Sequence, residues 1–217
     1  MPPGRRGKYL GFVAHEIKNP LATALWSCDL LKRMDAADRA GPRADKMIDA
    51  SLRALRRMRR LVDDYFTIER LQEHGYELRS ESVELRSLVE GAISQLGEKE
   101  GTSTEGWSMD VPAQVQVAGD QDMLKRAIRL LFEHLARGAA GTRVSIVGRS
   151  APEGAQLVMR ANPVPERIVP PIPEERPSGD PTGAVLGFSL AETILRAHDG
   201  SVEERDNALF VVLPARS

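Results

Sequence analysis

Two long amphipathic stretches near the N-terminus constrain the fold most strongly. In both, apolar residues recur every three or four positions, which is the spacing of one face of an α-helix. The sequence predicts helices over residues 5–34 and 43–71, joined by a loop at 35–42 that contains Gly and Pro. One antiparallel pair of helices cannot bury both apolar stripes, whereas two pairs make a four-helix bundle. We therefore expect residues 1–74 to form a helical hairpin that assembles as a homodimer.

The first of these helices holds a histidine with a carboxylate beside it and an amide one turn further on. The run is Phe12-Val13-Ala14-His15-Glu16-Ile17-Lys18-Asn19-Pro20-Leu21. Asn19 follows His15 at i+4, so both side chains share one helix face, roughly 6 Å apart. Pro20 removes one helical hydrogen bond and is expected to bend the helix. A lone histidine on a helix is more often a half-buried core residue, so the functional interpretation depends on its neighbours.

The run His-Glu-Ile-Lys-Asn-Pro-Leu resembles the H-box of sensor histidine kinases. This resemblance implies that His15 is phosphorylated on its ring and that Glu16 helps to activate it by fixing the ring tautomer. It also implies that Asn19 positions water or the phosphoryl oxygens of a partner receiver domain. The likeness extends over both helices, which resemble the dimerisation and phosphotransfer domain of that family. His15, Glu16 and Asn19 are therefore the predicted catalytic residues.

The remainder, residues 75–217, alternates helices with short strands. Helices are expected at 83–97, with Ser82 as N-cap, at 122–137 and at 186–198; strands are expected at 76–78, 107–110, 115–118, 142–149, 155–161, 201–204 and 209–213. This order favours a mixed sheet with helices on one face, an α/β sandwich. It resembles the catalytic, ATP-binding domain that follows the dimerisation domain in histidine kinases. The predicted fold class of the whole chain is therefore α+β.

Two of the three places where that family binds ATP and Mg²⁺ lack the expected residues. The family has two asparagines on one helix, the second of which binds Mg²⁺; here Leu130 and His134 take their places. Neutral imidazole is a poor ligand for a hard cation. Ala161 stands where the family has an aspartate that reads adenine, and prolines follow it where glycines are expected.

The third place, a glycine-rich run before the last helix, is only partly retained. Gly183 and Gly187 remain, but Val185 occupies the middle position, where a glycine would let the backbone approach phosphate. Together these replacements affect the residue expected to bind Mg²⁺, the residue expected to recognise adenine and the glycines expected to contact phosphate. We therefore expect a degenerate nucleotide site with no cofactor and no metal. ATP and Mg²⁺ would be needed only by an active kinase of unusual design.

The main functional hypothesis is a dimeric histidine phosphotransfer protein of a two-component phosphorelay. Its phosphoryl group would be carried on His15 and exchanged with the aspartate of a response-regulator receiver domain. The resemblance to dimeric transfer proteins with a degenerate kinase-like domain supports it. Two alternatives stay open: a divergent but active ATP-dependent autokinase, and a pseudokinase that only dimerises and binds a partner. Nucleotide binding separates the first two, and phosphoryl acceptance by His15 separates the first from the third.

Composition limits the location and the partners. The chain has 217 residues and one cysteine, Cys28, so a disulfide within it is impossible and a reducing compartment is expected. No apolar run approaches the roughly 20 residues that span a bilayer, and a cytoplasmic location without a membrane segment is expected. Five arginines lie between residues 53 and 60, without interleaved aromatic residues. We interpret them as a solvated helix face and expect no nucleic-acid partner. Only 14 residues precede His15, so the chain either lacks a sensor region or is a fragment.

Overall fold

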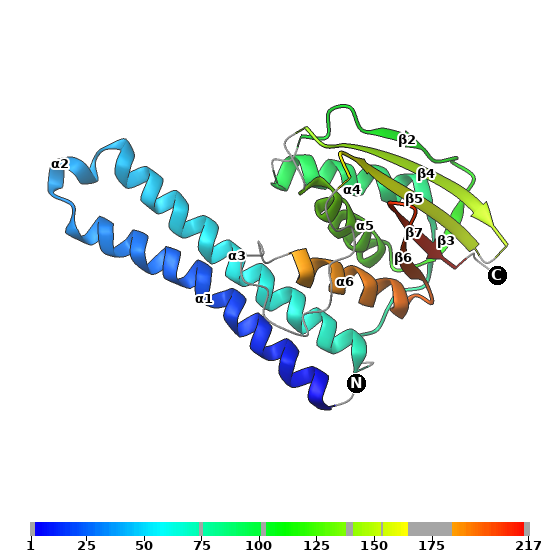
Figure 1. The fold of residues 1–217 in the computed structure, drawn as a ribbon, viewed down its shortest axis with the longest axis horizontal. Coiled ribbons are helices and arrows are strands. Elements are labelled where there is room, and N and C mark those ends of the chain that lie inside the picture. The colour runs from blue at the N-terminus through cyan, green and yellow to red at the C-terminus, as the bar shows by residue number, and fades with distance from the viewer. Residues whose placement is uncertain are drawn as a thin grey trace. The chain divides into compact units, whose positions relative to one another are not determined.

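The computed structural model describes residues 3–73, 76–100, 103–137, 141–152, 154–164 and 184–214, without the side chains of residues 3–12, 98–100 and 184–185. The chain forms two compact units, Met1–Thr67 and Ile68–Ser217. The first is helical, and the second combines strands with helices (Figure 1). This is the α+β fold that the sequence predicted. None of the described helices is both long and apolar enough to cross a membrane.

The first unit is built from two long antiparallel helices, α1 (Pro3–Arg33) and α3 (Pro42–Gln72) (Figure 1). Between them the chain forms a single-turn helix, α2 (Ala36–Arg39), where only a loop was predicted. Asp35 caps this turn, because its carboxylate accepts a hydrogen bond from the backbone N–H of Asp38 at 2.8 Å. The first N–H groups of a helix have no partner within the helix, and an aspartate at this position supplies one.

Small side chains line the seam between α1 and α3. Ala24 and Ser27 of α1, with Ser51 and Ala54 of α3, are buried, which lets the two helices approach closely. The Ser51 hydroxyl donates to the carbonyl of Ala24 at 3.5 Å, so residues 24 and 51 lie opposite each other. Because the helices are antiparallel, each step forward on α1 matches a step back on α3. This register determines which residues of α3 lie level with His15.

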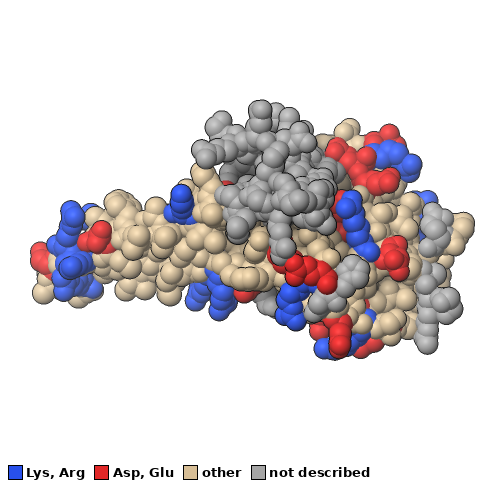
Figure 2. Space-filling model, turned by 90° about the horizontal axis from the view of Figure 1, so that it is seen from below, with Lys and Arg blue, Asp and Glu red and all other residues tan. Residues whose placement is uncertain are grey.

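Several of the larger apolar side chains of the hairpin lie outside the seam. Leu21, Leu25 and Cys28 of α1 are exposed in the single chain. Each of the three follows a buried residue by one position and is therefore turned away from the seam by about 100°. On the face that Figure 2 presents, uncharged side chains cover long stretches of the hairpin between separate groups of Lys and Arg.

The exposed apolar residues of α3 lie on the same side of the hairpin as Leu21, Leu25 and Cys28. Leu52 follows the buried Ser51, and Leu55 follows the buried Ala54. In two antiparallel helices that face each other, the residue that follows a seam residue points to the same side of the pair on both helices. We call this side the apolar face; it consists of Leu21, Leu25 and Cys28 of α1 and Ile48, Leu52, Leu55 and Phe66 of α3.

The described residues of the second unit form two sheets. A short sheet pairs β1 (Glu81–Glu84) with β3 (Gln116–Gly119) in antiparallel fashion. The larger sheet has the order β2-β4-β5-β7-β6, with β2 (Ser108–Asp110), β4 (Arg143–Ala151), β5 (Gly154–Asn162), β6 (Ser201–Arg205) and β7 (Ala208–Leu213). Among the strands that the structure describes, only β2 and β4 run parallel. The mixed sheet was predicted, but its division into two sheets was not.

Three helices lie on one face of the larger sheet (Figure 1): α4 (Leu85–Glu100), α5 (Gln121–Ala136) and α6 (Ala184–Ala197). The core between the layers is apolar, and Leu88, Leu131, Leu157 and Ile194 have no solvent exposure. Along β4, buried and exposed residues alternate, as expected of a strand with one covered face. The predicted α/β sandwich is thus present.

The beginning of the second unit differs from the prediction. Residues 76–78 form no strand, and Ser82 lies within β1 instead of capping a helix. Val83 of β1 stands opposite Val117 of β3. This pairing joins segments more than thirty residues apart in the sequence, so it outweighs the local signal for a helix cap.

A buried polar network joins the ends of α5 and α6. The carboxylate of Asp120 accepts hydrogen bonds from two N–H groups in the first turn of α5, each at 3.1 Å, and from the backbone N–H of Arg79 at 3.3 Å. The N–H of Asp120 donates to Nε2 of His198 at 3.1 Å. Nδ1 of His198 lies 2.7 Å from the carbonyl of Ile194, so Nδ1 carries the proton. The network therefore requires a neutral imidazole at position 198.

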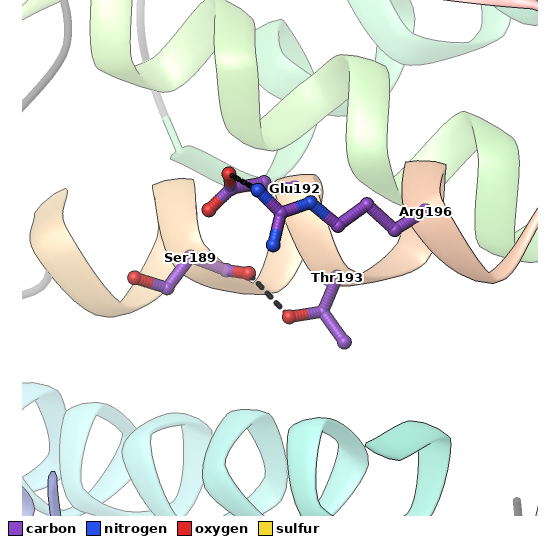
Figure 3. A network of polar contacts seen from close by, with 4 residues as sticks. All are labelled: Ser189, Glu192, Thr193 and Arg196. Atoms are coloured by element: carbon purple, nitrogen blue, oxygen red, sulfur yellow. Dashed lines mark hydrogen bonds and ion pairs between the residues drawn. The ribbon is translucent and has the colours of Figure 1, made fainter. Parts of the chain in front are cut away.

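The polar side of α6 forms its contacts within the helix (Figure 3). The Thr193 hydroxyl donates to the carbonyl of Ser189 at 2.8 Å, and the Arg196 guanidinium pairs with the Glu192 carboxylate at 2.6 Å. Pairs four residues apart stabilise a helix by a few tenths of a kcal/mol each. The opposite side of α6 supplies Leu190 and Ile194 to the core.

Candidate functional site

His15 and Glu16 occupy neighbouring positions on α1 but face different surroundings. The side chain of His15 is 59% exposed, whereas that of Glu16 is 3% exposed and turned into the seam. Oε1 of Glu16 lies 3.8 Å from Nδ1 of His15. That distance is too long for a hydrogen bond, so in this structure Glu16 does not hydrogen-bond the ring whose tautomer it was expected to fix. Nε2 is the ring nitrogen remote from the carboxylate.

Asn19 is exposed one helical turn beyond His15, as the i+4 spacing predicted. α1 continues through Pro20, which is buried. The backbone carbonyl of Asn19 accepts a hydrogen bond from the Thr23 hydroxyl at 3.2 Å. The structure therefore brings the three predicted residues together, with His15 and Asn19 open to solvent and Glu16 beneath them.

One further exposed residue on this side of α1 was not singled out from the sequence. Trp26 is 62% exposed and lies eleven residues after His15. Eleven residues are close to three full helical turns, so the two side chains leave α1 in similar directions. The signal was present in the sequence as the spacing of His15, Asn19 and Trp26.

His134 of α5, at the position predicted to replace a Mg²⁺ ligand, is an apolar contact. It is 7% exposed, and its ring packs edge to face against Phe188 of α6, with centroids 5.3 Å apart. Neither ring nitrogen has a hydrogen-bond partner among the described residues. Burial and, to a smaller extent, the positive charge of Arg137 lower the pKa of His134 from 6.5 to about 4. At neutral pH this imidazole is therefore uncharged.

Leu130 and Gly187 lie close together between α5 and α6. Leu130 is 6% exposed, and a Cβ added to Gly187 would lie 3.3 Å from its side chain. The close approach of the two helices therefore accounts for this glycine without a phosphate. Gly183 lies outside the described residues, and so does the side chain of Val185.

Ala161 is on β5, opposite Val144 of β4, and is 3% exposed. Its methyl group can neither donate nor accept a hydrogen bond, so this side chain cannot recognise an adenine amino group by hydrogen bonding. Among the described residues, no three His, Cys, Asp or Glu side chains gather as a cation site. The side chains of Leu130, His134 and Ala161 contain no oxygen, the ligand atom that Mg²⁺ prefers.

Comparisons with known proteins agree with the motif on α1. Residues 5–74 match the His Kinase A (phospho-acceptor) domain. The probable sensor protein PcoS of Escherichia coli is 24% identical over 94% of this chain and 45% of its own length. The sensor protein VanS of Enterococcus faecium is 24% identical over 97% of this chain and 58% of its own. The chain thus spans about half the length of these relatives.

Solved structures show the same fold. The Acinetobacter baumannii histidine kinase AdeS superposes with a TM-score of 0.69 at 13% identity, covering 94% of this chain and 98% of AdeS. The histidine kinase ThkA, solved in complex with the response regulator protein TrrA, gives 0.59 at 17% identity over 97% of this chain and 62% of ThkA. The matched domain, the motif on α1 and the relatives agree: residues 5–74 match a phospho-acceptor domain, and the chain as a whole is similar to sensor histidine kinases.

Proposed function

We propose that this chain carries a phosphoryl group on His15 and exchanges it with the aspartate of a response-regulator receiver domain. One observation carries the proposal. An exposed His15 stands beside the buried carboxylate of Glu16, one turn from the exposed Asn19, within the residues that match a phospho-acceptor domain. The exposed side of α1 leaves the ring accessible to another protein.

The transfer step follows from this arrangement. Nε2 of the neutral ring attacks the phosphorus of the receiver's aspartyl phosphate. An N–P bond forms while the bond from phosphorus to the aspartate oxygen breaks, and the aspartate leaves as a carboxylate. Nδ1–H stays toward Glu16, whose negative charge offsets the positive charge that the ring gains. The reverse transfer uses the same contacts, and Asn19 orients a water molecule when the receiver's phosphate is hydrolysed.

The acting form that we infer is a homodimer joined through the apolar face. Leu25 is 59% exposed and Leu55 49% exposed in the single chain. Burying one such side chain contributes about 1.5–3 kcal/mol, and a second hairpin with the same face is self-complementary around a two-fold axis. The proposed partner class also agrees with ThkA, which has been solved with a response regulator.

A second candidate is ATP-dependent autophosphorylation of His15. The names of the relatives favour it, because the matching proteins of 24–25% identity are sensor proteins and sensor histidine kinases. The described residues of α5, β5 and α6 favour transfer without ATP, because His134 and Ala161 lack the required oxygen ligands. The two candidates share His15 as phosphoacceptor and differ in the donor.

The test uses radiolabelled ATP and radiolabelled phosphorylated receiver domains as alternative donors. We expect acid-labile, base-stable label on the wild type from a receiver and none from ATP with Mg²⁺. His15→Ala should accept no label while keeping the wild-type mass in light scattering. Label from ATP alone would establish the autokinase. Label that persists in His15→Ala would show that another residue is the acceptor, and a wild type that no receiver labels would favour a pseudokinase that only binds its partner.

A further inference from the structure

The larger sheet of the second unit has one face without a covering helix. α4, α5 and α6 all lie on the other face (Figure 1), and among the described residues of this unit no helix lies opposite them. On β4, Val144 and Ile146 are 1% exposed and point toward the helices, so the residues that alternate with them point outward. The pairing of the strands then identifies the outward residues of the other four strands.

A row of paired outward residues crosses the centre of this uncovered face. It runs from Asp110 on β2 through Val147, Val158 and Phe210 to Glu203 on β6. Val158 is 4% exposed, and Val147 and Phe210 are half-buried. Outward positions of a sheet that faces water are normally polar, so three adjacent apolar residues on the middle strands depart from that pattern. We call Val147, Val158 and Phe210 the apolar row.

Arginines lie on both sides of the apolar row. Arg149 follows Val147 by two residues on β4, whereas Arg160 stands opposite Ser145 and is therefore on the other side of the row. Residues along a strand advance about 3.4 Å each, so the two arginines are about 14 Å apart along the strands, with the row midway. Both are exposed, and among the described residues neither has a carboxylate partner.

The charge of this face is opposite in sign to that of the surrounding chain. Residues 71–217 carry 15 Lys and Arg against 22 Asp and Glu. The Cζ atom of Arg205 lies 4.5 Å from the centroid of the Phe210 ring, which brings positive charge to one end of the apolar row. We call the uncovered surface the outer sheet face; it consists of the apolar row, the arginines Arg143, Arg149, Arg160 and Arg205, and the carboxylates Asp110 and Glu203.

We propose that the outer sheet face binds an amphipathic helix of a partner protein, with apolar residues along one side and acidic residues on both flanks. A helix with its side chains is about 10–12 Å wide, which fits the space of about 14 Å between Arg149 and Arg160. The row from Asp110 to Glu203 spans four strand spacings, about 19 Å, or about 13 residues of helix. The bound helix adds a third layer to the sheet and its helices. The inference is independent of the proposed function, because it requires no chemistry at His15.

The carboxylates at the ends of the row favour this partner over other anionic surfaces. Asp110 and Glu203 lie on the two edge strands, in line with the apolar row. An anionic membrane would bring its head groups close to both carboxylates. A helix can carry glutamates on its flanks and neutral residues at its ends, so that it contacts the arginines and avoids Asp110 and Glu203. A second copy of the outer sheet face is disfavoured as well, because two surfaces of the same net charge would meet.

The experiment exchanges charges between the chain and a synthetic helix. The probe is a fluorescein-labelled helical peptide of about 14 residues, with leucines on one side and glutamates on both flanks; in the control peptide lysines replace the glutamates. Fluorescence anisotropy measures their binding to the full chain. The variants are Phe210→Ser and the double variant Arg149→Glu with Arg160→Glu. The matched control is Arg43→Glu, the same change of charge at an exposed position in the first turn of α3.

We expect the wild type to bind the glutamate peptide about tenfold or more tightly than the lysine peptide, with a smaller difference at high salt. The double variant should reverse this preference and bind the lysine peptide more tightly, a result that a loss of folding could not produce. Phe210→Ser should weaken binding of the glutamate peptide about tenfold, because an aromatic residue at the centre of an interface contributes strongly to affinity. Arg43→Glu should bind both peptides as the wild type does.

Three outcomes would overturn the proposal and leave the proposed function intact. The first is a wild type that does not bind the glutamate peptide, or a double variant that keeps the wild-type preference. The second is displacement of the bound peptide by vesicles of phosphatidylserine and phosphatidylcholine, which would identify a membrane surface as the partner. The third is a mass above that of a dimer in light scattering that Phe210→Ser lowers, which would place a second copy of the chain on the outer sheet face.

Discussion

The burial of His134 predicts a specific dependence of stability on pH. Its pKa is lowered from 6.5 to about 4 in the folded chain by burial and by Arg137. Between these values the unfolded chain binds a proton at this position and the folded chain does not. Folding stability therefore rises with pH in this window. The contribution is fully present above pH 6.5 and is lost as the pH falls toward 4.

The size of this effect follows from the shift. Each pKa unit corresponds to about 1.4 kcal/mol, so His134 should account for a loss of roughly 3 kcal/mol between pH 7 and pH 4. In His134→Leu an apolar side chain replaces an imidazole that has no hydrogen-bond partner among the described residues. That variant should lack this part of the pH dependence and be at least as stable as the wild type at pH 7.

Urea unfolding followed by Trp107 fluorescence measures the difference. Trp107 packs on Phe132 of α5, with ring centroids 5.4 Å apart, so it reports on the helix that carries His134. A Trp26→Phe background leaves Trp107 as the only tryptophan of the chain. Parallel loss of stability in both proteins between pH 6.5 and 4 would refute the buried, neutral state of His134.

Three further predictions concern the fold and the acceptor. Gly119→Ala should destabilise the second unit by about 2 kcal/mol or more, because φ of Gly119 is +155° and the new Cβ would lie 2.6 Å from Cδ2 of His198. Thermal unfolding measures the loss, and Gly97→Ala is the control, because a Cβ at position 97 would have nothing within 4 Å. Leu25→Glu should convert the dimer to a monomer in light scattering, because an unpaired charge would be buried in the interface. Alanine at His15 should change the unfolding free energy by less than about 0.5 kcal/mol, since its side chain is exposed.

Periodicity was sufficient to predict the long helices. The boundaries of α1, α3 and α5 lie within two residues of those expected, because apolar residues recur every three or four positions over many turns. Hydrogen bonds within a helix are local, so the sequence contains most of what determines them. The spacing of His15 and Asn19 was predictable for the same reason.

Features that depend on contacts between distant segments were not predictable. Ser82 has the local chemistry of a helix cap, but Val83 pairs with Val117 and draws the segment into a strand. The apolar pattern of α1 was broad enough to include Leu25, yet only the register with α3 determines which residues enter the seam. The contact of His134 with Phe188 likewise joins two helices that a Pro-rich segment separates in the sequence.

The replacements around the nucleotide position support one another physically. Leu130 packs against Gly187, and His134 packs against Phe188, so two positions that would bind a nucleotide instead contribute apolar contacts between α5 and α6. Restoring asparagine at position 134 alone would place an amide beside an aromatic ring, without a cation to coordinate. A buried polar group without partners costs about 1–3 kcal/mol. On the proposal that this chain exchanges phosphoryl groups without ATP, no single reversal at these positions should create ATP binding, whereas the proposed exchange needs only the exposed His15 on α1 and the neighbouring Glu16.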